Sequence, residues 1–273
     1  MILHWHFDPI LFQLGPVAVR WYGLLFVGGF YAGLMMIQRI FRAEGRDPAQ
    51  AERLFMVALL GTVVGARLAH CLFYEPEYYL SHPLAILRIW EGGLASHGGV
   101  AGLVLGVWWG WRRLDPRPSF LWLLDRVAIP GAFVAICIRV ANFLNSEIVG
   151  LPTSGGWGVV FESVDALPRH PAQLYEAVAY LLIFGLLVAL YRRFGRGTPH
   201  GLLTGALLAL VFAARIAVEF VKTPQATYEA GQTFTVGQWL SVPFVLIGVG
   251  MVVRAWRAPR PAMDPPDDAA GPR

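Results

Sequence analysis

The sequence predicts an all-α integral membrane protein with about seven transmembrane helices and a small external cap loop. Hydrophobic residues make up 56% of the 273 positions and charged residues only 15%, whereas soluble domains carry about 25% charged residues. The mean hydropathy is +0.53. Apolar residues are gathered in stretches near the 20 or so that a helix needs to cross a bilayer. Helices are expected because an open strand leaves unpaired backbone groups in lipid.

The apolar stretches divide the chain into three parts. An external segment, 1–16, precedes a polytopic membrane domain, 17–255, and a tail, 256–273, whose prolines and aspartates predict disorder. The external cap loop is expected at about 142–173. Several stretches are short and rich in glycine, which is typical of closely packed membrane helices. The expected spans are 17–37, 54–73, 94–111, 120–141, 174–191, 201–218 and 237–253.

The distribution of Lys and Arg predicts the orientation of these spans. The connections after the first, third and fifth spans, together with the tail, carry 14 of the 22 cations. The N-terminal segment and the other three connections carry three. Because cytoplasmic loops are enriched in Lys and Arg, we expect an external N-terminus and a cytoplasmic C-terminus.

Five cations lie within or at the ends of the spans, and four of them are expected at one depth. Arg20, Arg67, Arg139 and Arg215 fall within about 10 Å of the outer boundary at about 1.5 Å per helical residue. His97 is expected at the same level. Charged groups at membrane depth are costly, and guanidiniums bind phosphate through paired charge-assisted hydrogen bonds. The four arginines together therefore favour an anionic lipid headgroup as a ligand.

Each of these groups also has a plainer explanation. An arginine can pair with a helix carbonyl or with a carboxylate such as Glu147 or Glu176, and Arg215 and Glu219 are four residues apart on one face. His97 suits either a general base near neutral pH or a neutral imidazole bonded to backbone. Both explanations remain open at this point.

Two polar segments interrupt the apolar pattern. In Arg139–Gly150, Arg139 and Asn142 are three residues apart and so share a helical face that can address one ligand. The segment Trp90–Gly99 is too polar and glycine-rich for lipid, so we expect a loop or half-helix that dips into the bundle and lines a cavity. Tyr22 suits either a headgroup hydrogen bond or the aromatic belt.

Other chemistries find no support in the sequence. The two cysteines, Cys71 and Cys137, lie in apolar runs, so neither a disulfide framework nor a metal site is expected. No Ser-His-Asp order or phosphate-cradling glycine loop is found in the sequence. A nucleic-acid partner is excluded by the class of protein.

The polar segments carry a resemblance to a known family. Arg139-x-x-Asn-Phe-Leu-Asn-x-Glu-x-x-Gly150 resembles the signature of the bacterial prolipoprotein diacylglyceryl transferases, and the similarity covers about residues 17–255. Further blocks occur in the same order, namely Arg20-Trp-Tyr-Gly23, Gly65-Ala-Arg-Leu68, Trp90-x-Gly-Gly-x-x-x-His-Gly-Gly99, His170-Pro-Ala-Gln-Leu-Tyr-Glu176, Arg215-x-x-x-Glu219 and Gly237-Gln-Trp-Leu-Ser241.

The resemblance implies a reaction and its substrates. The family transfers the diacylglyceryl group of phosphatidylglycerol to the lipobox cysteine thiol of a prolipoprotein signal peptide, as the first step of lipoprotein maturation. A thioether forms and glycerol phosphate leaves, with no metal or other cofactor. The expected location is the bacterial cytoplasmic (inner) membrane, with the active site toward the outer leaflet and membrane lipids around it.

The resemblance also implies roles for individual residues. Arg139 and Arg215 would hold the phosphate, and either His97 or an arginine-polarised water would deprotonate the thiol. The implied catalytic residues are His97, Arg139 and Arg215. The implied phosphatidylglycerol-binding residues are Tyr22, Arg139, Asn142, Asn145, Glu147, Gly150, Arg215 and Glu219.

The rival hypothesis is a transporter or flippase for an anionic lipid. It would use the same arginines and the same broken segment, 90–99. A transporter should expose its site alternately to both sides of the membrane, whereas the polar groups here are expected on one side.

Overall fold

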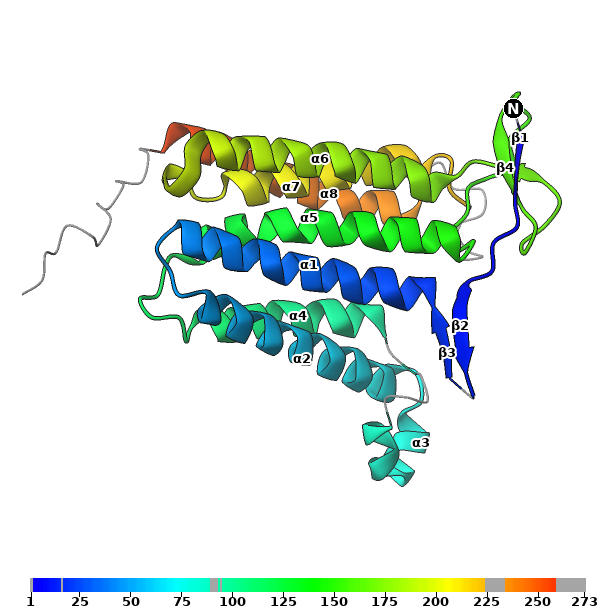
Figure 1. Ribbon diagram of the computed structural model, residues 1–273, viewed down its shortest axis with the longest axis horizontal. Helices are drawn as coiled ribbons and strands as arrows, with labels where there is room; N and C mark the ends of the chain where they lie inside the picture. The colour runs from blue at the N-terminus through cyan, green and yellow to red at the C-terminus, as the bar shows by residue number, and fades with distance from the viewer. Residues whose placement is uncertain (1, 16, 89–92, 94, 224–233, 259–273) are drawn as a thin grey trace, which may run out of the picture. The chain divides into compact units, whose positions relative to one another are not determined.

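The computed structural model describes residues 2–15, 17–88, 93, 95–223 and 234–258 (Figure 1). The chain forms two compact units, and each is described by itself. The first contains residues 1–36 and 124–273, and the second contains residues 37–123. The helices are α1 Trp21–Ala43, α2 Pro48–Phe73, α3 Pro76–Ser81, α4 Ser96–Trp111, α5 Phe120–Leu144, α6 Ala172–Phe194, α7 Leu202–Glu219 and α8 Val236–Arg257.

Hydropathy identifies the helices that can cross a membrane. Within the described residues, six helices are long and apolar enough to span a bilayer, and residues 98–111 of α4 form a shorter apolar helix. Large apolar side chains face outward, as Leu182 on α6 (70% exposed) and Leu246 on α8 (66% exposed) illustrate. The protein is therefore an all-α, multi-pass membrane protein of about seven helices, as predicted.

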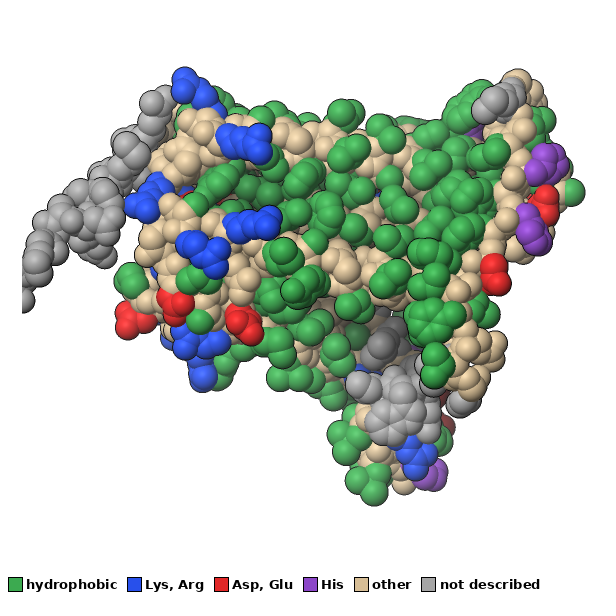
Figure 2. Space-filling view, viewed as in Figure 1, with side chains coloured by type: hydrophobic (Ala, Val, Ile, Leu, Met, Phe, Trp, Pro, Cys, Tyr) green, Lys and Arg blue, Asp and Glu red, His purple; other side chains and the backbone are tan. Residues whose placement is uncertain are grey.

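Charged side chains are concentrated where helices end. Figure 2 shows apolar side chains along the helices, and Lys and Arg side chains gathered at the end where α6 and α8 finish. The last turns there contain Arg192 and Arg193 on α6, and Arg254 and Arg257 on α8. Helix α8 continues to Arg257, and residues 259–273 of the predicted tail lie outside the described part.

The first predicted span is wrong at its start. Val17–Arg20 forms β3, which pairs antiparallel with β2, Ile10–Leu14, and α1 begins only at Trp21. The β-branched valines of this stretch suit a strand. Arg20 is therefore the last residue of a hairpin, directly before the helix.

The predicted cap loop contains a small sheet. Strand β4, Gly158–Phe161, pairs parallel with β1, Ile2–Trp5, and antiparallel with β5, Pro168–Arg169. Phe143 at the end of α5 packs with Phe161 and Trp5 beneath this sheet. The cap is thereby attached to the α5 end that carries the signature motif.

Glycines allow α2 and α4 of the second unit to pack at backbone distance. A Cβ on Gly102 would lie 2.0 Å from the Gly61 carbonyl oxygen, and one on Gly65 would lie 2.3 Å from the Gly98 oxygen. Small residues four apart permit this approach, as in other membrane helix pairs. The glycine-rich character predicted for the spans thus has a direct packing role.

The connection before α4 is only partly described. It contains α3 and a 3₁₀ turn, η1 Pro83–Leu87. Residues 89–92 and 94 of the segment expected to dip into the bundle lie outside the described residues. The expected cavity along that segment therefore remains a prediction.

Close contacts also order the helices of the first unit. Gly29 on α1 faces Cys137 on α5, where an added Cβ would lie 3.0 Å from the Cys137 Cβ. Near the other end of α5, the buried Asp125 carboxylate accepts hydrogen bonds from the Gly201 and Thr204 amides. Asp125 thereby satisfies amides at the start of α7, which would otherwise be unpaired inside the protein.

Candidate active site

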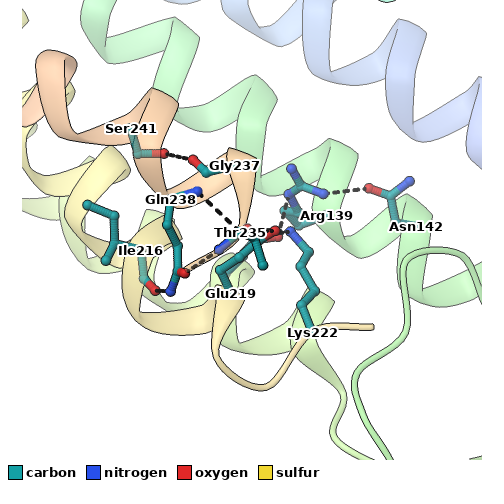
Figure 3. A network of polar contacts seen from close by, with 10 residues as sticks. Arg139, Asn142, Ile216, Glu219, Lys222, Thr235, Gly237, Gln238 and Ser241 are labelled. Carbon is teal, nitrogen blue, oxygen red and sulfur yellow. Dashed lines mark hydrogen bonds and ion pairs between the residues drawn. The ribbon is translucent and has the colours of Figure 1, made fainter. Parts of the chain in front are cut away.

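Arg139 lies near the end of α5 and is fixed by two neighbouring side chains (Figure 3). Its Nε lies 2.9 Å from Glu176 Oε2 on α6, and its Nη1 donates to Asn142 Oδ1 at 3.3 Å. The Arg139 side chain is 15% exposed. A guanidinium carries five N–H groups, so these contacts leave donors for a further acceptor.

Glu176 is shared between Arg139 and a buried lysine. Lys222 Nζ donates to Glu176 Oε1 at 3.1 Å and lies 3.6 Å from Glu219 Oε2. Relative exposure is 0% for Glu176, 6% for Lys222 and 8% for Glu219. Charges of alternating sign therefore connect α5, α6 and the end of α7.

The start of α8 is attached to the same network. The Thr235 hydroxyl donates to Glu219 Oε1 at 3.3 Å, and Thr235 also forms a capping box with Gln238. Gln238 Nε2 in turn donates to the Ile216 carbonyl oxygen on α7 at 3.1 Å. Figure 3 shows these groups from α7 and α8 beside Arg139.

The turn after α5 holds a second carboxylate close to Arg139. Glu147 accepts from Asn142 Nδ2 at 3.0 Å and from Asn145 Nδ2 at 3.1 Å. Ser146 and Ile148 have φ angles of 54° and 56°, a region that costs non-glycine residues roughly 1–3 kcal/mol each. The side-chain hydrogen bonds to Glu147 help to hold this strained turn.

Gly150 ends the turn at a point with no room for a side chain. A Cβ there would lie 2.4 Å from the His170 oxygen and 2.7 Å from the Val221 oxygen. Its amide donates to the His170 carbonyl at 2.9 Å, and its carbonyl accepts from Arg169 Nη1 at 3.0 Å. Close backbone packing therefore accounts for this glycine without a ligand.

Arg169 is itself fixed within the cap by a salt bridge to Asp165. Hydrogen bonds from Arg169 hold the pKa of the partly exposed Asp165 below its ordinary value. This contribution to stability is present above the unfolded-state pKa and is lost as the pH falls through the lower folded-state pKa.

A pocket of about 570 Å³ opens beside the start of α1. Tyr22, Asn145 and Glu147, three of the predicted lipid-binding residues, lie in its wall together with Arg20. Among the described residues, the lining is Ala18, Val19, Arg20, Tyr22, Gly23, Leu24, Asn145 and Glu147.

The predicted site residues of the first unit are thus largely brought together. Arg139, Asn142, Asn145 and Glu147 form one chain of hydrogen bonds, and Glu219 is joined to Arg139 through Glu176 and Lys222. Tyr22 reaches the same chain at the pocket.

Arg215 differs from one of its expected arrangements. Among the described residues it forms no ion pair with Glu219, which contacts Lys222 and Thr235 instead.

The Arg67 side chain pairs with backbone carbonyls, which is the plainer of its two explanations. Its Nε and Nη groups donate to the carbonyls of Ala85, Ile86, Arg88 and Gly93 at 2.7–3.2 Å. It is 4% exposed. Arg67 therefore secures the connection after α2, and the expectation that it addresses a headgroup is not supported.

His97 lies in the second unit, in the first turn of α4. The placement of its imidazole lies outside what the structure describes, so its predicted role as a base remains a prediction.

Two members of the charged network were not predicted as site residues. The sequence indicates Glu176 only as a possible counter-ion of an arginine, and Lys222 is one of the three cations in the connections expected outside. Lys222 is the single lysine among 22 cations and stands three residues after Glu219. A single lysine three residues after a glutamate indicates a possible buried ion pair, although the pairing of Lys222 with Glu176 depends on the fold.

The fold and this network define a polytopic membrane protein with a guanidinium-containing polar site at the ends of its helices. A sequence model described as prolipoprotein diacylglyceryl transferase matches residues 9–254. The chain therefore belongs to the prolipoprotein diacylglyceryl transferase family. The resemblance seen in the sequence is confirmed, and with it the class of enzyme.

Individual relatives are similar to this chain over nearly their full length. The chain is 57% identical over 252 residues to a phosphatidylglycerol–prolipoprotein diacylglyceryl transferase from Tolumonas auensis, covering 92% of this chain and 97% of the relative. A protein of the same name from Chloroherpeton thalassium is 46% identical over 253 residues, covering 93% and 94%. One from Bacteroides fragilis is 39% identical over 259 residues, covering 90% and 93%.

Replacing Lys222 tests whether the charged network stabilises the fold. Lys222→Met removes the ammonium between two buried carboxylates, so we expect a loss of about 3–5 kcal/mol, as when one partner of a buried ion pair is deleted. Thermal unfolding of the purified protein in detergent measures the effect. Arg193→Met, which removes an exposed cation from α6, is the control and should change little.

A double variant isolates the electrostatic cause. Adding Glu219→Gln to Lys222→Met removes one of the two carboxylates that have lost the ammonium and should restore part of the stability. Wild-type stability for Lys222→Met alone would contradict the role assigned to this lysine.

Proposed function

We propose that this chain transfers the diacylglyceryl group of phosphatidylglycerol to the lipobox cysteine thiol of a prolipoprotein. The cysteine sulfur forms a C–S bond with the glyceryl carbon, and the bond from that carbon to the phosphate oxygen breaks. The oxygen keeps the electron pair, glycerol phosphate leaves, and a base takes the thiol proton. The observation that carries the proposal is the Arg139 guanidinium, fixed within the family motif with donors to spare.

The main proposed role of Arg139 is to bind the phosphate as it becomes a leaving group. Its contact with Glu176 fixes the plane of the guanidinium, and Asn142 fixes one of its terminal nitrogens. Donors that are held in place before the reaction stabilise developing charge without reorganisation. Arg215 would add a second guanidinium.

The other site residues would shape the lipid site. Tyr22, Asn145 and Glu147 line the pocket beside α1, where they can hydrogen-bond to a headgroup. Gly150 would act by allowing the close packing that positions the turn. Glu219 would act through Lys222, which it helps to hold beside Glu176.

His97 is the proposed base. A thiol with an unperturbed pKa of about 8.5 is mostly protonated at neutral pH, and imidazole can accept its proton there. Its position in the first turn of a membrane helix is compatible with this role. An arginine-polarised water is the alternative base.

The proposed environment is the bacterial inner membrane. The N-terminal segment 1–16 and the cap at about 142–173 would be external, and the tail 256–273 cytoplasmic. The 14-to-3 asymmetry of Lys and Arg supports this orientation. The site would then face the outer leaflet, where a secreted prolipoprotein can present its signal peptide.

A product assay tests the function directly. Purified protein, phosphatidylglycerol vesicles and a lipobox peptide should give a peptide whose mass increases by one diacylglyceryl group. The same peptide with Ser in place of Cys should not react. Movement of lipid between leaflets without any lipidated peptide would instead support the transporter hypothesis.

Arg139 provides the sharpest test of the proposed site. Arg139→Lys keeps the charge but loses the planar pair of donors, and losing one charge-assisted hydrogen bond is worth roughly 1.5–3 kcal/mol. We expect transfer about tenfold to a hundredfold slower, and slower still for Arg139→Ala.

The rates are compared at matched membrane levels, with Arg192→Lys on the far end of α6 as the control. If Arg139 served only as counter-ion to Glu176, the lysine variant would be nearly as active as wild type. Full activity in both variants would remove Arg139 from the site.

The base hypothesis predicts a pH signature for His97. His97→Gln should lower the transfer rate by about 100-fold or more at neutral pH, with partial recovery as the pH rises toward the thiol pKa. His82→Gln, an exposed histidine of the same unit, is the control. A wild-type rate in His97→Gln at neutral pH would exclude His97 as the base.

The orientation predicts the outcome of reporter fusions. A reporter joined after Arg113 or Arg193 should lie in the cytoplasm, and one inserted near Gly155 should be external. A cytoplasmic reporter at Gly155 would overturn both the orientation and the proposed leaflet.

A further inference from the structure

The outward face of α8 has a shallow groove near the end of the helix. Among the described residues, the groove has a volume of about 480 Å³ and is lined by Gly250, Val253, Arg254, Arg257 and Ala258. The first four of these follow the spacing i, i+3, i+4 and i+7, so they lie on one helical face. The opposite face packs on α7, where Gly248 and Met251 closely approach Gly205. The groove is therefore directed away from α7.

The α8 groove lies far from the Arg139 network. Thr235 attaches the start of α8 to that network through Glu219. At about 1.5 Å per residue, Arg254 lies roughly 27 Å further along the helix, which is close to the thickness of the hydrocarbon core of a bilayer. Trp256 is 58% exposed, and exposed tryptophans of membrane proteins gather at the level of the headgroups. The groove therefore belongs to the membrane surface opposite to the Arg139 network.

Arginines at the end of a membrane helix have an ordinary explanation that involves no ligand. Lys and Arg near the ends of the spans set their orientation, and cations stabilise the last turn of a helix. Figure 2 shows that the cations at this end also extend over α6, where Arg192 and Arg193 are exposed. Positive charge alone therefore does not define a site.

The spacing of Arg254 and Arg257 suits them to hold one anion together. They are three residues apart, so they are neighbours on the helix surface and repel each other, whereas the adjacent Arg192 and Arg193 do not face each other. Within the described residues, neither guanidinium of the α8 pair has a hydrogen-bonded acceptor or a carboxylate partner. An anion between them would offset the repulsion and accept a charge-assisted hydrogen bond from each.

Gly250 leaves room for an apolar chain beside the two arginines. It is exposed, and an added Cβ would meet no atom within 4 Å among the described residues. Glycine inside a helix is less favourable than alanine, and here neither a close helix contact nor a positive φ angle requires it. Together with the exposed Val253 it forms an apolar wall. From Arg257 to Gly250 this face runs for about 10 Å, from the headgroup level into the hydrocarbon.

We propose that the α8 groove binds one anionic phospholipid, with its phosphate between Arg254 and Arg257 and part of an acyl chain along Gly250 and Val253. The lipid belongs to the leaflet opposite to the Arg139 network, so it is not the donor of the proposed reaction. Free phosphate would satisfy the arginines but leave the apolar wall uncovered. A zwitterionic lipid would place a further cation beside two arginines. The inference stands on the geometry of α8 and does not depend on the proposed function.

Lipid binding to the purified protein tests the groove. The protein in detergent is mixed with dioleoyl phosphatidic acid or dioleoyl phosphatidylcholine, and the retained lipids are counted by native mass spectrometry. The wild type should retain phosphatidic acid in preference. Replacing both arginines, Arg254→Gln with Arg257→Gln, should raise the dissociation constant of one retained phosphatidic acid about tenfold or more, as for lost charge-assisted contacts. Unchanged binding in this double variant would overturn the proposal.

Two matched variants separate the groove from the general basic surface. Arg192→Gln with Arg193→Gln removes an equal charge from the end of α6 and should leave that dissociation constant unchanged. Gly250→Leu keeps both arginines, and its Cβ enters open space, so the protein should fold while the groove is filled. We expect the constant to rise about threefold to tenfold through the lost apolar contact. Equal weakening by the two double variants, or no effect of Gly250→Leu, would indicate a diffuse basic surface and overturn the site.

Competition with inorganic phosphate distinguishes a lipid site from a plain anion site. Because it has no acyl chain, phosphate in excess over the lipid should displace little of the phosphatidic acid that the wild type retains. Full displacement would assign the groove to a small anion and overturn the lipid proposal. These measurements use no lipobox peptide and no turnover, so their result is independent of the transferase assay.

Discussion

The Glu176 carboxylate has no exposed surface, and the arrangement of the first unit depends on how its charge is neutralised. A lone carboxylate in that position would be strongly disfavoured. Arg139 from α5 and Lys222 from the segment after α7 supply cations at 2.9 and 3.1 Å. Buried ion pairs add little net stability compared with apolar packing, but breaking one is costly. The pair therefore serves mainly to fix where the guanidinium lies.

The backbone of the turn after α5 also supports the position of the Arg139 guanidinium. Gly150 fits between the His170 and Val221 carbonyls, which brings the turn after α5 against the segment carrying Lys222. The strained Ser146 and Ile148 between Asn142 and Gly150 persist because Glu147 is held at both carboxylate oxygens. Strain of this kind is maintained only where surrounding contacts determine the conformation, so the turn and the ion pair reinforce each other.

The sequence predicted what depends on local spacing. Membrane helices follow from the length of apolar runs, and the shared face of Arg139 and Asn142 follows from the helical repeat, since the two side chains do contact each other. The pairing of Lys222 with Glu176 joins residues 46 positions apart, and no local pattern encodes it. The same holds for β1, which pairs with β4 from the second sequence segment of the unit. The sequence could not show that Arg67 binds backbone carbonyls in place of a ligand, because those carbonyls belong to the irregular connection after α2.

In the proposed reaction Arg139 would be counter-ion and ligand at once, the two explanations that the sequence left open for each arginine. Its contact with Glu176 uses one edge of the guanidinium, and Lys222 adds a cation that offsets the carboxylate. In the proposed reaction, a fixed guanidinium would stabilise the leaving phosphate, which gains charge as the ester bond breaks, more than it stabilises the intact lipid. The carboxylates would then hold Arg139 in place while leaving guanidinium donors for the substrate.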